Sequence, residues 1–154
     1  MLGRATARVA LVALGATMAL LPAFTAGAST KGDAPHSSLC ASLHSLAPAL
    51  STDSTAYAKA FKAHKWAAEK AAYLSGLTIQ VEEYSLLDQA SSSAPKNVRS
   101  AVPSAIKAAS SLRRDLDEAK SALDFASPGS SVVILAFNAA QKPLVAFFDK
   151  QCGS

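Results

Sequence analysis

Few residues of this 154-residue chain have the type and spacing that a catalytic, metal or ligand site requires. Its three histidines are His36, His44 and His64, and its two cysteines are Cys40 and Cys152. A zinc site needs three or four convergent ligands, and Cys40 with His44 supplies only one of them if the cysteine is oxidised. We therefore expect no metal site.

Tyr57, Phe61 and His64 form a candidate ligand-binding group. If they lie on one helix, Tyr57 and His64 face the same way about two turns apart, with Phe61 between them. Tyrosine and histidine are both axial ligands of haem iron, and a cleft lined by them and by alanines would admit a flat ligand. The alternative is a core histidine whose ring nitrogens meet a hydroxyl or a backbone carbonyl. One histidine and one tyrosine are not by themselves a haem motif.

Trp66 stands among lysines, including Lys62 and Lys70. Tryptophan is enriched where proteins contact their partners, so these three residues are a candidate partner surface. Tyr73 lies nearby, but Leu77 continues its apolar stripe. We expect Tyr73 in the core and Trp66 exposed.

No arrangement of residues indicates an enzyme. Glu82 and Glu83 are adjacent and point about 100° apart on a helix, so they cannot face one substrate. Asp115, Asp117 and Glu118 stand beside basic residues, which is typical of a solvated helix face. There is no G-x-S-x-G elbow and no glycine-rich phosphate loop. We expect a non-enzymatic protein, and an enzyme of an unrecognised class is the third alternative.

The first 28 residues have the layout of a secretory signal peptide. Arg4 and Arg8 begin it, an apolar run follows from Val9 to Leu21, and Ala26-Gly27-Ala28 offers small residues for cleavage. A membrane anchor is the alternative, but the run is short for a bilayer span and we see no second one after it.

Removal of residues 1–28 leaves 126 residues with 13 basic and 11 acidic side chains, so the net charge falls from +4 to +2. This small charge gives no electrostatic case for a nucleic-acid partner. We expect residues 29–36 to form a flexible tail and residues 37–154 to form one helical domain. The expected location is outside the cytoplasm, in the cell envelope or the medium.

Cys40 and Cys152 stand near the two ends of this exported chain. Outside the cytoplasm two cysteines usually pair, and closing so long a loop stabilises a fold by about 4–5 kcal/mol in the loop-entropy model. The alternative is a lipidated Cys40, which requires a small preceding residue, but Leu39 precedes it. We predict a disulfide between Cys40 and Cys152.

The apolar periodicity predicts an all-α fold: an up-and-down bundle of three longer helices plus a short N-terminal helix. The longest stripe runs along Val98–Ala126, with a kink or a helix start at Pro103. Its members recur every three or four residues, all of them apolar: Val98, Val102, Ala105, Ala109, Leu112, Leu116, Ala119, Leu123 and Ala126.

The other helices are expected on either side of this one. Residues 37–47 should form the short helix, ending at Pro48. Residues 55–90 should form a long helix with two apolar stripes, and the sequence leaves open whether this helix bends at Gly76. Residues 132–152 begin with six apolar residues, which would suit a strand, but a lone strand has no pairing partner, so we expect a buried helix.

Several features together resemble small secreted helical proteins of actinobacteria. These are the position of Cys40, the turn Ala94-Pro95 after a long helix, the continuation Val98/Val102, and Phe147-Phe148 before Cys152. The resemblance covers most of the exported chain. It implies a secreted helical fold and no assigned activity.

We therefore expect a secreted, non-enzymatic helical bundle that binds a protein partner or a small apolar ligand. The alternative function is an extracytoplasmic carrier of haem or another hydrophobic ligand. We expect no other cofactor, no nucleic-acid partner and no membrane span after the signal peptide.

Overall fold

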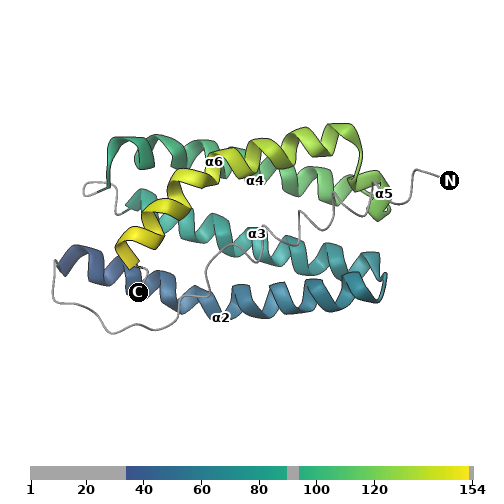
Figure 1. The fold of residues 1–154 in the computed structure, drawn as a ribbon, viewed down its shortest axis with the longest axis horizontal. Helices are drawn as coiled ribbons and strands as arrows, with labels where there is room; N and C mark the ends of the chain where they lie inside the picture. The colour runs from purple at the N-terminus through teal and green to yellow at the C-terminus, as the bar shows by residue number, and fades with distance from the viewer. Residues whose placement is uncertain (1–33, 90–93, 153–154) are drawn as a thin grey trace.

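The computed structural model of this chain describes residues 34–89 and 94–152. All regular structure in these residues is helical, as the sequence predicted. The helices are α2 (Ala34–Lys62), α3 (Trp66–Gln89), α4 (Lys96–Glu118), the one-turn α5 (Ala122–Phe125) and α6 (Pro128–Cys152) (Figure 1).

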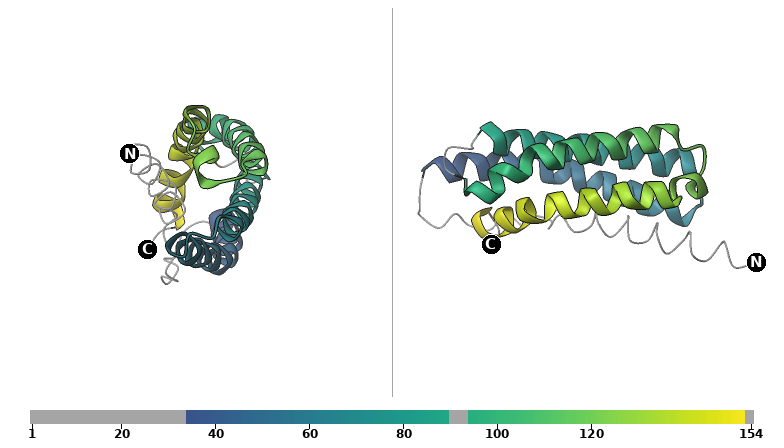
Figure 2. Two further views of the ribbon diagram at one scale, coloured as in Figure 1. Left: turned by 90° about the vertical axis from the view of Figure 1, so that its right-hand side faces the viewer. Right: turned by 90° about the horizontal axis from the view of Figure 1, so that it is seen from above.

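The four long helices form a bundle in which each packs against the next along the chain. The α2–α3 and α4–α6 pairs make the broadest contacts, α3 joins the two pairs, and α6 meets α2 only sparsely. Seen end-on, the helices surround one interior (Figure 2). Aromatic and leucine side chains fill it, and the largest of those that are almost completely buried are Tyr84, Phe125, Phe137 and Phe148.

The predicted disulfide between Cys40 and Cys152 is confirmed, with 5.3 Å between the two Cα atoms. It ties the beginning of α2 to the last residue of α6, at the end of the helix that turns toward α2 in Figure 1. Because α2 and α6 share few other contacts, this bond is their main link. A structural disulfide is typical of proteins that fold in oxidising compartments.

The prediction that a helix ends at Pro48 is wrong, because α2 runs from Ala34 through Pro48 to Lys62. It also takes in the end of the expected tail, residues 34–36. A proline inside a helix costs about 3 kcal/mol, and the long packing surface of α2 on α3 offsets this cost. Beyond Pro48 the chain stays helical, and the Thr52 and Thr55 hydroxyls donate to the carbonyls of Pro48 and Ser51, at 2.9 Å each.

The prediction of one helix over residues 55–90 is also wrong. The helix is interrupted at residues 63–65, where His64 has a backbone φ of 55°. Gly76, where a bend was left open, lies buried inside α3. The Lys65 N–H donates to the Ala60 carbonyl at 3.0 Å and the His64 N–H to the Phe61 carbonyl at 3.1 Å. This is the Schellman arrangement, in which a left-handed residue ends the helix. Glycine usually takes that position, and here histidine does.

The stripe predicted along Val98–Ala126 is correct for its first seven members, which are all buried. It fails at Leu123, which is 59% exposed, because α4 ends at Glu118 and Ala119 is extended. A new helix then starts at Ser121, whose hydroxyl accepts the Asp124 N–H at 3.1 Å. Pro95 occupies the N-cap of α4.

The last segment, α6, is a helix, as predicted, and Ser127 caps its beginning. The Ser127 hydroxyl accepts the Ser130 N–H at 3.3 Å. By length and composition α6 could cross a membrane, so the expectation of no second apolar run is wrong. Of its most apolar window 28% is buried, and the large apolar side chains of α6 that stay exposed are Val132 and Leu135.

Candidate functional site

Tyr57, Phe61 and His64 do not share one helix face. Tyr57 is 5% exposed, and its ring stacks on Phe61 at 6.2 Å and tilts against Tyr73 at 5.9 Å between ring centroids. His64 lies beyond the end of α2, exposed in the turn. Burial also raises the pKa of the Tyr57 phenol, and the nearby Glu69 adds to this rise, which disfavours the phenolate that would bind iron.

Two of the three residues expected to form a partner surface are engaged within the molecule. Trp66 is half-buried, and its ring lies 6.1 Å from that of Phe125. The Lys70 ammonium donates to the backbone carbonyls of Asp117 at 2.7 Å and Ala119 at 3.3 Å, where it satisfies the end of α4. Lys62 is exposed.

The bundle interior holds a carboxyl group that the sequence analysis did not place there. Glu83 is 1% exposed, and neither of its carboxylate oxygens has a hydrogen-bond partner in the described structure. Burial raises its pKa to about 8, and the charge of Glu82 adds to this rise. Near neutral pH Glu83 is therefore largely a protonated acid.

Glu83 is one of several polar groups in the interior. On the next residue, the Tyr84 hydroxyl donates to Gln141 Oε1 of α6 at 3.2 Å, and Gln141 Nε2 donates to Asn138 Oδ1 at 3.1 Å. Asp53 and Glu69 each bury one carboxylate oxygen without a described partner. Burial raises the pKa of Glu69, and His64 opposes the rise.

These acids do not form a metal or acid–base site. Among the described residues no group of three histidine, cysteine, aspartate or glutamate side chains converges. Glu82 is exposed while Glu83 is buried, so the two cannot act on one substrate. Glu83 lines neither the cavity between α3 and α4 nor the groove between α4 and α6, so its burial bears on stability.

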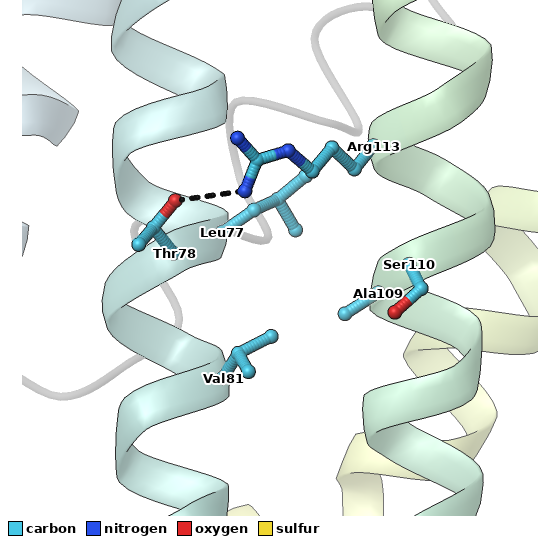
Figure 3. Close-up of a pocket in the computed structure, with 6 residues that line it drawn as sticks. All are labelled: Leu77, Thr78, Val81, Ala109, Ser110 and Arg113. Carbon is cyan, nitrogen blue, oxygen red and sulfur yellow. Dashed lines mark hydrogen bonds between the residues drawn. The ribbon is translucent and has the colours of Figure 1, made fainter.

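A small cavity of about 140 Å³ lies between α3 and α4. Arg113 reaches across it from α4, and its Nη1 donates to Thr78 Oγ1 of α3 at 3.5 Å, while Val81 and the small Ala109 and Ser110 leave the space below (Figure 3). Ligand pockets usually measure roughly 300–1,000 Å³. This cavity is too small for anything but water or a very small molecule.

A larger groove of about 370 Å³ lies between α4 and α6 and falls within that size range. Five of its eight lining residues are alanine or serine, too small to fill the space between the helices. The lining residues are Ser104, Lys107, Ala108 and Ser111 of α4 and Val132, Val133, Ala136 and Ala140 of α6.

The charge at this groove is positive. Lys107 lines it and is exposed, and α4 has no acidic residue before Asp115. Val132 at the groove is 66% exposed and Leu135 on the same helix is 67% exposed. The groove thus combines apolar walls, exposed aliphatic side chains and one ammonium group, which suits a ligand with an apolar body and an anionic end.

Comparison with known proteins supplies no identity. No protein-family model, no curated protein and no solved structure matches this chain. The resemblance to secreted actinobacterial proteins stays a prediction.

Proposed function

We propose that this is a secreted, non-enzymatic helical-bundle protein that acts by binding, and that the groove between α4 and α6 takes a small apolar ligand with an anionic end. The observation that carries the proposal is the groove itself, with walls of alanine, serine and valine and Lys107 as its one charged lining residue. The disulfide supports the extracytoplasmic location. An up-and-down order of the four long helices belongs to the same proposal and is supported by the packing of each on the next.

The ligand class follows from the lining. A slim acyl chain fits between walls of small side chains. Large side chains such as leucine or phenylalanine at these positions would fill the space instead. The ammonium group of Lys107 favours a carboxylate or a phosphate at the anionic end of the ligand, while the apolar body of the ligand lies in the groove. A fatty carboxylate is the simplest molecule with both parts.

A fluorescent fatty acid such as cis-parinaric acid tests this proposal by titration. Ala136→Phe adds a ring inside the groove and should weaken probe binding by about tenfold or more, equivalent to about 1.4 kcal/mol. Lys107→Met should weaken it less and remove its dependence on salt. The matched control, Ala58→Phe, adds the same ring to an exposed position of α2 and should change nothing.

Two results would contradict the groove as the site. One is binding that Ala136→Phe and Ala58→Phe leave equally intact. The other is the absence of saturable binding to the unaltered protein.

Haem carriage stays a prediction without structural support, because His64 does not share a helix face with Tyr57. A haem titration of Tyr57→Phe and His64→Ala would test it. Unchanged affinity in both variants would end that alternative.

A further inference from the structure

The cavity between α3 and α4 has an apolar inner wall and a charged, polar mouth (Figure 3). Leu77 and Ala109 on the inner wall are 3% and 1% exposed, whereas Thr78, Ser110 and Arg113 at the mouth are exposed to solvent. The cavity volume is about 140 Å³. A protein cavity of about 150 Å³ can hold one benzene molecule, so this one suits a ligand of about six non-hydrogen atoms.

The guanidinium of Arg113 is the one charged group among the six lining residues. It reaches across from α4, and its Nη1 donates to Thr78 Oγ1 at 3.5 Å, which is long for a hydrogen bond. This bond uses one of the five N–H donors of a guanidinium. An ionised carboxylate accepts two parallel bonds from the same group at about 2.7–2.9 Å, so it is a stronger partner for Arg113 than the Thr78 hydroxyl is.

The two hydroxyl groups at the mouth do not add donors for a ligand. Thr78 Oγ1 donates to the Leu74 carbonyl and Ser110 Oγ donates to the Ile106 carbonyl, at 2.9 Å each. The backbone N–H groups of the lining residues lie inside α3 and α4, where they donate to the preceding helical turn. Arg113 therefore supplies the N–H donors that a ligand in this cavity would meet.

We propose that this cavity binds a short-chain carboxylate of about four carbons, such as butyrate, with its carboxylate on Arg113 and its alkyl chain against the apolar wall of Leu77, Val81 and Ala109. A phosphate also fits the fork of a guanidinium. Its remaining oxygens, however, would face these three apolar side chains without hydrogen-bond donors, which is unfavourable. The apolar wall therefore favours a carboxylate that carries an alkyl chain.

Two exposed carboxylates of this chain stand near the cavity in sequence, and neither belongs to its lining. Glu82 follows Val81 on α3, and Asp117 lies about one turn beyond Arg113 on α4. Exposed carboxylates attract a guanidinium only weakly, so they do not prevent Arg113 from binding an anion. They do lower its affinity for one, and we expect a dissociation constant in the millimolar range.

This inference does not depend on the proposed function, because the cavity lies on the α3 side of α4 and shares no lining residue with the α4–α6 groove. The two sites also differ in the ligands that they admit. The groove is large enough for a fatty acyl chain, whereas the walls of the cavity limit the chain to about four carbons.

Titration of the purified, oxidised protein with acetate, propionate, butyrate, hexanoate and octanoate, followed by ¹H–¹⁵N NMR at constant ionic strength, tests the site. The backbone amides of Thr78 and Ser110 should shift in a saturable way, and they report on the cavity separately from the groove. Affinity should rise about fourfold with each methylene up to butyrate, because each is buried against the apolar wall. It should fall for hexanoate and octanoate, since the buried Leu77 and Ala109 close the inner end.

Arg113→Gln should weaken butyrate binding about tenfold or more, because it removes the paired N–H donors and their charge. Arg114→Gln is the matched control, because it removes the same charge from the exposed neighbour outside the lining, and it should leave the affinity within about twofold. Both positions are exposed, so both variants should keep the unaltered thermal midpoint. Ala109→Val should fill part of the cavity and move the preferred ligand from butyrate to propionate or acetate.

The absence of saturable shifts at Thr78 and Ser110 with butyrate at about 100 mM would overturn the proposal. Equal affinities of Arg113→Gln and Arg114→Gln for butyrate would do the same. Affinity at these amides that keeps rising through octanoate would place the alkyl chain outside the cavity. Inorganic phosphate that competes as well as butyrate would show a site for anions in general and not for short-chain carboxylates.

Discussion

Replacing Glu83 by glutamine should stabilise this protein, and the gain should grow with pH. The carboxyl group is 1% exposed and neither oxygen has a described hydrogen-bond partner, so its charged form is poorly solvated. Glutamine has the same shape and no charge. Its amide would be no better paired than the protonated acid, so the two forms should differ little at acid pH.

The magnitude follows from the pKa, which burial raises from 4.5 to about 8 in the folded protein. The folded state therefore holds the proton more tightly than the unfolded state, and stability is fully present below pH 4.5 and is lost as the pH rises toward 8. Each pKa unit corresponds to 1.36 kcal/mol. The loss is about 3 kcal/mol at pH 7 and approaches about 5 kcal/mol above pH 8, and Glu83→Gln should recover it.

The assay is thermal or guanidinium unfolding followed by circular dichroism from pH 4 to pH 9. At pH 7 the variant should melt about 10 °C higher than the unaltered protein, and at pH 4 the two midpoints should nearly coincide. Glu82→Gln is the matched control, because it removes the same charge from the exposed neighbour. Parallel pH profiles for the unaltered protein and Glu83→Gln, or equal gains from both variants, would refute the reasoning.

Three further predictions concern stability. His64→Gly should raise the free energy of unfolding by about 1 kcal/mol, because glycine adopts the left-handed conformation without strain, and a loss measured by guanidinium unfolding would contradict the motif. Reduction of Cys40–Cys152 should lower the free energy of unfolding by up to about 4–5 kcal/mol, and with it the thermal midpoint, while the helical circular-dichroism signal largely persists. An unchanged midpoint would show that the bond is not structural. Lys70→Met should cost about 1 kcal/mol by removing the donor to the last carbonyls of α4, and Lys62→Met, at an exposed position, should cost nothing in the same assay.

The parts of the fold that followed from the sequence are those in which one strong pattern dominates. The stripe from Val98 to Leu116 is apolar at every position, so its burial in α4 was predictable. The Cys40–Cys152 bond was predictable because two cysteines leave one intramolecular pairing. The continuation to Leu123 failed although Ser121 and Asp124 carry a capping pattern that could have marked a new helix.

The helix boundaries around α2 depended on tertiary structure. Pro48 is a strong local signal for a helix end, yet packing on α3 overrides it. The actual end relies on a left-handed histidine, a conformation that sequence propensities assign to glycine or asparagine. No local pattern distinguishes His64 from a residue inside a helix.

The buried carboxyl group of Glu83 and the groove between α4 and α6 were missed for two different reasons. The buried stripe of α3 that contains Glu83 also contains Glu69 and Gln80, so its regular spacing was hidden by three polar members. Locating the groove requires knowledge of which apolar side of α6 faces the core. The sequence shows only that α6 is apolar on several sides, and packing determines which of them stays exposed.

Native mass spectrometry of the protein recovered from its own host tests the binding account most directly. We predict a protein that carries a bound apolar anion, with the added mass lost in Ala136→Phe and retained in Ala58→Phe. A bound mass that Ala136→Phe retains, or a protein that is consistently recovered bare, would contradict the assignment of the α4–α6 groove as a ligand site.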